Sequence, residues 1–312
     1  MTIGIAASGP SAGAAVRDAL LGAELLGRGS IKGFAVFTVF DPDGAPQWRS
    51  TQDGGLGTLA LPESWASAQR AAVISSGPNR PEPLDQFLPA ASGRGMVTGH
   101  RLPNSTTTDG QPLNEAVLRG MSEGSLSQDR LEELLCMTPE LDAGIVALGA
   151  DGTLALGNTE RALRRNDLGS FLHCGPSGNI GILLNTIYCA QGDAMSLAHR
   201  LGGLALSRLE GRPGDIVHLA GPVPIRAAER DFARIDAQGT ILEIGTSNPL
   251  TLHDTTRVTV LYSGADILGD EGRLGSAETE IFAAVRDGQV QPHAPVASRS
   301  AVVRRSCAPS KV

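Results

Sequence analysis

The chain has 312 residues, of which 41% are hydrophobic and 19% charged, a balance that excludes an intrinsically disordered protein. Its net charge of −7 and pI near 5.4 argue against a nucleic-acid-binding protein, which carries a basic face. No stretch stays apolar over the roughly 18 residues that a membrane span needs, and no charged leader precedes an apolar run. We therefore expect a cytoplasmic protein.

The first elements follow from apolar periodicity. The short apolar run over 2–7 predicts a buried strand, and alanine and leucine at helical spacing predict a helix over 11–26. The segment GFAVFTVFDPDGAPQWRS predicts a hairpin, because an apolar run meets a turn signal at 41–44. The same pattern predicts hairpins over 143–158 and 232–245. We also expect helices near 63–72, 112–123, 127–137, 184–209 and 277–287, loops over 76–110 and 210–226, and a strand over 257–263.

Hairpins interleaved with helices indicate an α+β fold rather than repeated βαβ units. Strands that are apolar on both faces favour two antiparallel sheets packed on each other, with helices outside. No linker-like segment interrupts the chain, so we expect one domain over 1–298. The basic stretch 299–312 is expected to be a solvated, frayed tail; its cations are Arg299, Arg304, Arg305 and Lys311.

The cysteines carry no metal-binding or redox spacing. No pair forms a CxxC motif, and no HxH or HExxH spacing links the histidines. We expect no metal and no cofactor, with thiols that are reduced and mostly buried. The residues concerned are Cys136, Cys174, Cys189, Cys307, His199, His218, His253 and His293.

Thr2 is the first candidate catalytic residue. If Met1 is removed, Thr2 carries both a nucleophilic hydroxyl and an α-amine that can act as its general base. Lys32, expected on a following strand, would lower the pKa of that amine by its charge. The alternative is that Thr2 merely begins a strand.

The segment GHRLPNS, 99–105, holds three further candidates in a loop stiffened by Pro103. His100 can shuttle a proton, Arg101 can bind a carboxylate through two hydrogen bonds, and Asn104 can donate to an oxyanion. The alternative is an ordinary surface loop with a capping asparagine.

Two later segments supply candidate substrate-binding residues. LHCGPSGNIG, 172–181, places His173 and Asn179 around a glycine-rich turn whose amides could hold an anion, although it fits neither a dinucleotide fingerprint nor a P-loop. Arg161 and Arg165 follow the second predicted hairpin and could bind a substrate carboxylate. The alternative for 172–181 is a tight turn beside a buried cysteine, and the alternative for Arg161 and Arg165 is a solvated charged turn.

The second hairpin, DAGIVALGADGTLALGNT over 142–159, resembles the strand–turn–strand that opens the catalytic subunit of isoaspartyl peptidases and type 2 asparaginases. Asp142-Ala143-Gly144 occupies the place of that family's Thr-Val-Gly, so Asp142 stands where the nucleophile would be. The resemblance makes Arg165 or Arg161 the counterpart of the carboxylate-binding arginine. As a whole the chain is similar to a bacterial family of the N-terminal-nucleophile (Ntn) hydrolase-like fold, which implies a four-layer αββα sandwich.

Three functions are compatible with these residues. The first is an Ntn-type hydrolase acting on a small amide or amino-acid derivative, and the second is a catalytically inactive relative that binds a small ligand. The third is a different α+β enzyme that uses His100 or His173 as its base. The expected partner is a small molecule rather than a nucleic acid or a membrane, and a homo-oligomer stays open.

Overall fold

The chain divides into two compact units, Met1–Gly211 and Arg212–Val312, where the sequence analysis expects one domain over 1–298. The structure is a computed structural model. It describes residues 1–28, 31–121, 126–189, 192–212, 214–292 and 299–306.

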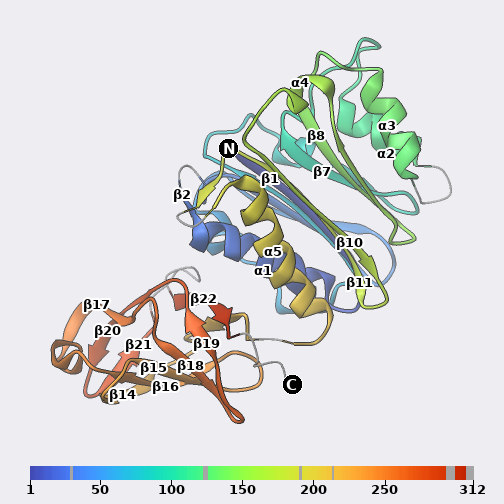
Figure 1. The fold of residues 1–312 in the computed structure, drawn as a ribbon. Coiled ribbons are helices and arrows are strands. Elements are labelled where there is room, and N and C mark those ends of the chain that lie inside the picture. The colour runs from blue at the N-terminus through green and yellow to red at the C-terminus, as the bar shows by residue number, and fades with distance from the viewer. Residues whose placement is uncertain (29–30, 122–125, 190–191, 213, 293–298, 307–312) are drawn as a thin grey trace, which may run out of the picture. The chain divides into compact units, whose positions relative to one another are not determined.

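The first unit is built on a six-stranded antiparallel sheet in the order β10-β11-β1-β5-β3-β4 (Figure 1). Every residue of the inner strand β1 is buried, which explains why its sequence TIGIAAS has no charged residue and does not alternate between apolar and polar residues. The strands of this sheet are β1 (Thr2–Ser8), β3 (Ala35–Phe40), β4 (Pro46–Thr51), β5 (Arg70–Ser76), β10 (Leu168–Gly175) and β11 (Gly178–Asn185).

Two long helices, α1 (Ala12–Leu26) and α5 (Ala194–Leu209), pack against each other and against this sheet. A Cβ on Gly22 of α1 would lie only 2.4 Å from the terminal methyl group of Leu204 of α5, so the two helices are in close contact at this glycine. Asp18 of α1 accepts from Nε of Arg208 of α5 at 2.7 Å, which ties the helices together by a buried carboxylate.

A four-stranded antiparallel sheet, in the order β6-β7-β8-β9, packs on the six-stranded sheet through contacts of β7 and β8 with β1. Its strands are β6 (Ala90–Ala91), β7 (Gly95–Arg101), β8 (Ala143–Gly149) and β9 (Leu154–Asn158). Apolar side chains from both sheets form one buried cluster, with Ala6, Val36 and Ile74 on one side and Met96 and Val146 on the other.

Shorter elements complete the first unit. The helices α2 (Leu113–Gly120) and α3 (Gln128–Cys136) bury leucines against the four-stranded sheet in a second cluster, and α4 (Glu160–Leu163) follows β9. A two-stranded ribbon pairs β2 (Gly27–Arg28) with β12 (Tyr188–Cys189). The 3₁₀ helices are η1 (Gly55–Gly57), η2 (Glu63–Ser67) and η3 (Leu84–Phe87).

The second unit is a curled sheet of ten strands, a half-barrel. Its order is β13-β22-β19-β18-β15-β16-β14-β21-β20-β17, and valine and isoleucine side chains from these strands form its core. The elements are β13 (Ile216–His218), β14 (Val223–Ala227), β15 (Phe232–Ile235), β16 (Ile241–Thr246), η4 (Pro249–Leu252), β17 (Thr255–Leu261), β18 (Asp266–Gly269), β19 (Gly272–Ala277), β20 (Ile281–Arg286), β21 (Gln289–Gln291) and β22 (Ser300–Arg305).

The predicted fold class, a four-layer αββα sandwich of two antiparallel sheets flanked by helices, is wrong. The chain is mostly β, with 41% strand and 24% helix, and its largest sheet is the half-barrel, whose unit contains no described helix other than the short 3₁₀ helix η4. That sheet is also mixed, because β14 pairs with β16 and β15 with β18 in parallel. The prediction is wrong because the first 211 residues combine strands with helices, and the same arrangement was assumed for the rest of the chain. The short strands of the second unit instead pair with one another in one sheet.

The predicted hairpins are confirmed as β3–β4, β8–β9 and β15–β16, and the helices over 11–26, 112–123 and 127–137 as α1, α2 and α3. Of the helix predicted over 63–72, only the short 3₁₀ helix η2 forms before the chain enters β5 at Arg70, and the helix predicted over 277–287 is wrong, since that segment enters β20. Strand pairing on both sides of each overrides their helix propensity. The predicted loop 76–110 contains β7, and the predicted helix 184–209 begins only at Ala194, after β11 and β12.

Two smaller predictions also change. The thiols of Cys136 and Cys174 are exposed and that of Cys189 is partly buried, whereas Cys307 lies outside the described residues. The predicted frayed tail is a paired strand as far as Arg305, because β22 lies between β13 and β19. Among the described residues, no helix combines the length and apolar character that a membrane crossing requires.

Candidate functional site

Thr2 lies at the start of β1, between the ends of two neighbouring strands. It pairs with Asn185 of β11 and with Ser76 of β5. Side chains alternate between the faces of a strand, and opposite residues of paired strands share a face. Gly4, two residues on, meets the backbone of Gly99 in the four-stranded sheet. Thr2, Asn185 and Ser76 therefore form a row that faces the other sheet.

His100 lies opposite this row, fully buried at the end of β7. Its Nδ1 is 3.2 Å from Oδ1 of Asn185 and its Nε2 is 2.6 Å from Oδ1 of Asn158. Burial lowers the pKa of His100 below its ordinary value, against the raising effect of these two contacts. The lowered pKa favours the neutral ring, which donates a hydrogen bond from only one of its nitrogens. Its place between two asparagine side chains suits a residue that positions Asn185 rather than one that shuttles protons.

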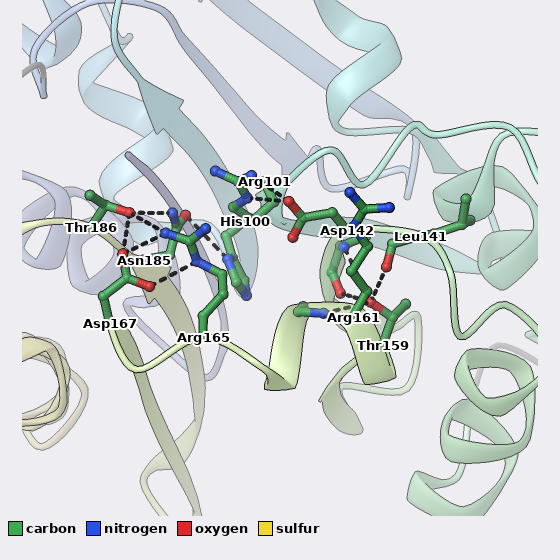
Figure 2. Close-up of polar contacts among 12 residues, drawn as sticks. His100, Arg101, Leu141, Asp142, Thr159, Arg161, Arg165, Asp167, Asn185 and Thr186 are labelled. Atoms are coloured by element: carbon green, nitrogen blue, oxygen red, sulfur yellow. Dashed lines mark hydrogen bonds and ion pairs between the residues drawn. The ribbon is translucent and has the colours of Figure 1, made fainter.

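A hydrogen-bond chain continues from Asn185 to a carboxylate, as Figure 2 shows. Nδ2 of Asn185 donates to Oγ1 of Thr186 at 2.7 Å, and that hydroxyl donates to Oδ2 of Asp167 at 2.5 Å. Arg165 donates to both oxygens of Asp167, at 2.8 and 2.6 Å, and to Thr186 at 3.1 Å. The Arg165 guanidinium and the Thr186 hydroxyl hold the pKa of Asp167 below its usual range.

On the other side of His100, Arg101 forms an ion pair with Asp142, which immediately precedes β8 (Figure 2). Nε of Arg101 donates to Oδ2 of Asp142 at 2.9 Å, and a terminal nitrogen donates to the same oxygen. The hydrogen bonds from Arg101 hold the pKa of Asp142 below its usual range. Asp142, which the resemblance puts in the place of a nucleophile, is thus an ionised partner of an arginine.

The amino terminus lies among cations. Half-burial is the main cause that lowers the pKa of the Met1 amine, and the charges of Arg101, Arg80 and Arg165 lower it further. Asp167 is the carboxylate that acts in the opposite direction. The structure therefore brings together the predicted residues Thr2, His100, Arg101 and Arg165 at one end of β1.

Two backbone positions at this site are strained. Arg101 has φ +64° and Thr186 has φ +55°, both in the left-handed region that side chains other than glycine rarely adopt. Strained residues of this kind cluster at functional sites, where packing and hydrogen bonds hold them. Both side chains belong to the network around His100, which agrees with a functional site here.

Three other predicted residues lie at or near this edge but have different contacts. Lys32 is exposed in the bend before β3 rather than on a strand, and its charge acts on Glu24, not on the amine. Asn104 donates to Oε1 of Gln86 at 2.8 Å and is occupied there. Arg161 is exposed on α4, and its charge reaches Asp142.

His173 and Asn179 lie far from the site. Asn179 pairs with Ser8, at the opposite end of β1 from Thr2, so six strand residues or about 20 Å separate it from Thr2. Its side chain donates to the carbonyl of Gly152 at 2.8 Å and accepts from the amide of Gly175. The glycine-rich turn whose amides were expected to hold an anion is the tight turn of the β10–β11 hairpin.

Sequence reasoning missed Arg80, Asn185, Thr186 and Asp167. The local pattern does not mark Arg80, Thr186 or Asp167, because their importance comes from strand ends that meet only in the folded sheet. A signal for Asn185 exists in retrospect: a polar residue ends the apolar strand GNIGILLN, as Ser76 ends RAAVISS. Within the ranges that the structure describes, no group of three or more histidine, cysteine, aspartate or glutamate side chains is placed to hold a metal ion.

Comparison with known proteins gives two family matches. The family described as Domain of unknown function (DUF6963) matches residues 2–216, and Domain of unknown function (DUF7259) matches residues 222–298. The boundary between them falls close to the boundary between the two compact units. A search of curated proteins finds no match to the chain. Since the first match spans more than half of the sequence, including every site residue described above, the chain belongs to the family DUF6963.

Proposed function

We propose that the chain is an amide-bond hydrolase in which Thr2, made the first residue by removal of Met1, attacks a small amide or amino-acid derivative. The observation that carries this proposal is the position of Thr2 at the point where Asn185, Ser76, His100 and three arginines converge. A threonine there, once terminal, supplies a hydroxyl and an amine on one residue.

In the first half of the reaction, Oγ1 of Thr2 bonds to the substrate carbonyl carbon while its proton moves to the α-amine. The tetrahedral intermediate collapses, the carbon–nitrogen bond breaks, and the leaving amine takes that proton. In the second half, water adds to the carbonyl carbon of the Thr2 ester and gives a proton to the α-amine. The bond between that carbon and Oγ1 then breaks, Oγ1 takes the proton from the α-amine, and the acid is released. The nearby guanidinium groups favour the negative oxygen of each intermediate.

The environment of the amine supports its role as a base. In the chain that retains Met1, half-burial and next the charges of the three arginines lower the pKa of the Met1 amine. The Thr2 amine that removal of Met1 creates lies one residue further along the chain, where the same cations favour the neutral form that a general base requires. Hydrolysis is therefore expected to rise with pH until this amine is neutral and to level off above that pH.

The experiment combines intact mass with turnover on a panel of small amides. The proposal predicts a chain that begins at Thr2, activity that Thr2→Val abolishes, and partial activity in Thr2→Ser, which retains a hydroxyl. Thr38→Val is the matched control, because Thr38 is a buried threonine of the same sheet whose hydroxyl has no hydrogen-bond partner among the described residues. A chain that keeps Met1 throughout, or equal turnover by Thr2→Val, contradicts the proposal.

The alternative is a related protein that binds a small ligand without turnover. The observation in its favour is Asp142, an ion-paired carboxylate where the resemblance places the nucleophile. This alternative is supported if a member of the amide panel raises the melting temperature of both the unaltered chain and the Thr2→Val variant, while the unaltered chain turns over no amide.

A further inference from the structure

Arg80 is held at the Thr2 end of β1 by two neighbours. Its Nε donates to Oγ of Ser76 at 2.9 Å, and Ser76 is the buried residue that pairs with Thr2. Its backbone is fixed on both sides by the side chain of Gln52, which accepts from the Arg80 amide at 3.0 Å and donates to the Arg80 carbonyl at 2.7 Å. The base of this half-buried guanidinium is therefore positioned before any ligand arrives.

The three arginines around the amine differ in how far they are neutralised. Arg165 donates to both oxygens of Asp167, and Arg101 is paired with Asp142. Arg80 has no carboxylate within ion-pair distance among the described residues. The carboxylate of Glu82, two residues away, instead accepts from Gln52 at 2.9 Å. The terminal nitrogens of Arg80 are thus the donors in this cluster that an incoming anion could take.

The charge balance also calls for an anion. Three guanidinium groups gather at the Thr2 end of β1, and two of them pair with Asp142 and Asp167, in a protein whose net charge is −7. Burial, and next the charge of Arg101, lower the pKa of Arg80. Like charges brought together out of water are unfavourable unless a counter-charge joins them.

We propose that Arg80, with Arg101 beside it, binds a carboxylate of the substrate, so that the substrate class is small amides that carry a free carboxylate. The planar fork of a guanidinium matches a carboxylate through two parallel hydrogen bonds, which would fix the distance from that carboxylate to Thr2. The inference rests on the proposed function for the reaction, but the binding event needs neither Met1 removal nor the Thr2 hydroxyl.

The test is calorimetric titration with succinate, using succinamide as its uncharged counterpart and inorganic phosphate as a second anion. We expect succinate to bind, succinamide to bind at least tenfold more weakly, and Arg80→Gln to weaken succinate at least tenfold. Arg119→Gln, an exposed arginine on α2 that pairs with Glu115, is the matched control and should stay within twofold. Arg80→Lys keeps the positive charge but loses the forked guanidinium, so its affinity for succinate should lie between those of the unaltered chain and Arg80→Gln.

The outcomes separate this inference from the proposed function. Equal succinate binding by Arg80→Gln and the unaltered chain, or tighter binding of phosphate than of succinate, overturns the carboxylate site even if Thr2 is catalytic. Binding lost in Arg80→Gln and kept in Thr2→Val supports the site even if no amide is hydrolysed. If Arg80→Gln does not fold, a succinate affinity in Arg80→Lys equal to that of the unaltered chain overturns it.

Discussion

Substitution of Gly4 by alanine tests whether the two sheets of the first unit meet as closely as the structure shows. A Cβ on Gly4 would lie 2.5 Å from the carbonyl oxygen of Gly99 and 2.6 Å from its nitrogen, where real Cβ atoms keep 3.0 Å or more. All the atoms it meets belong to the backbone of β7, which is held by its ladder with β8. The sheets would have to separate by about half an ångström next to the candidate site.

The expected cost follows from that geometry. Overpacking a well-filled core costs about 1–3 kcal/mol, and the upper end applies because no side chain can rotate away. A loss of about 3 kcal/mol corresponds to a fall in melting temperature of roughly 6–12 °C for a unit of this size. Because Gly4 lies two residues from Thr2, Gly4→Ala should also reduce any activity of the site more than its stability loss explains.

Chemical denaturation of the full chain, followed by circular dichroism, measures the effect. Gly203→Ala is the matched control, since a methyl group on that exposed glycine of α5 would have nothing within 4 Å, and alanine favours a helix by roughly 0.5–1 kcal/mol. The control should be slightly more stable than the unaltered chain. A Gly4→Ala protein as stable as the control would refute the close approach of β1 and β7.

Three further predictions concern other positions. Burial raises the pKa of Glu24 from 4.5 to about 7, so the folded state holds its proton more tightly than the unfolded state; stability should fall as pH rises from about 4.5 to 7. Glu24→Gln should remove this fall in the free energy of unfolding, which reaches about 3 kcal/mol at pH 8. Unfolding titrations of both proteins at pH 5 and 8 measure the difference. Asp18→Asn leaves Arg208 without its buried carboxylate and should cost about 3 kcal/mol in denaturant unfolding. A thiol reagent should modify Cys136 and Cys174 in the native chain, with adducts mapped by mass spectrometry; protection of both would contradict their exposure.

The sequence predicted those elements whose pattern is local. The hairpin over 143–158 carries its own turn signal, and the helix over 11–26 its own periodicity, so both agree with the structure. The helix predicted over 277–287 is wrong because Ala283 and Ala284 favour a helix, whereas the features that make this segment a strand are not local. Ala283 pairs with β17, which is remote in sequence, and Ala284 pairs with β21, which is weakly patterned. The half-barrel depends on strand pairings of this kind and could not be read from any single segment.

The candidate site was predictable only where one short segment held several functional groups. His100 and Arg101 are adjacent, and the site contains both, but the reasoning assigned them to a loop rather than to the end of β7. Arg80 and Asn185 could not be found, because their proximity to Thr2 arises from the pairing of β5 and β11 with β1. His173 and Asn179 were misplaced for the same reason, since the pairing of β10 with β11 and of β11 with β1 puts both residues near Ser8, at the other end of β1.

The most direct test of the central claim is the site of acylation by a small β-lactone, read from the mass of the N-terminal peptide. A β-lactone acylates a hydroxyl that a neighbouring base activates. We expect an N-terminal peptide that begins at Thr2 and carries one acyl group. The acyl group should be absent from the Thr2→Val variant and present in the Thr38→Val variant. An N-terminal peptide that retains Met1, or an acyl group on a residue other than Thr2, would contradict it.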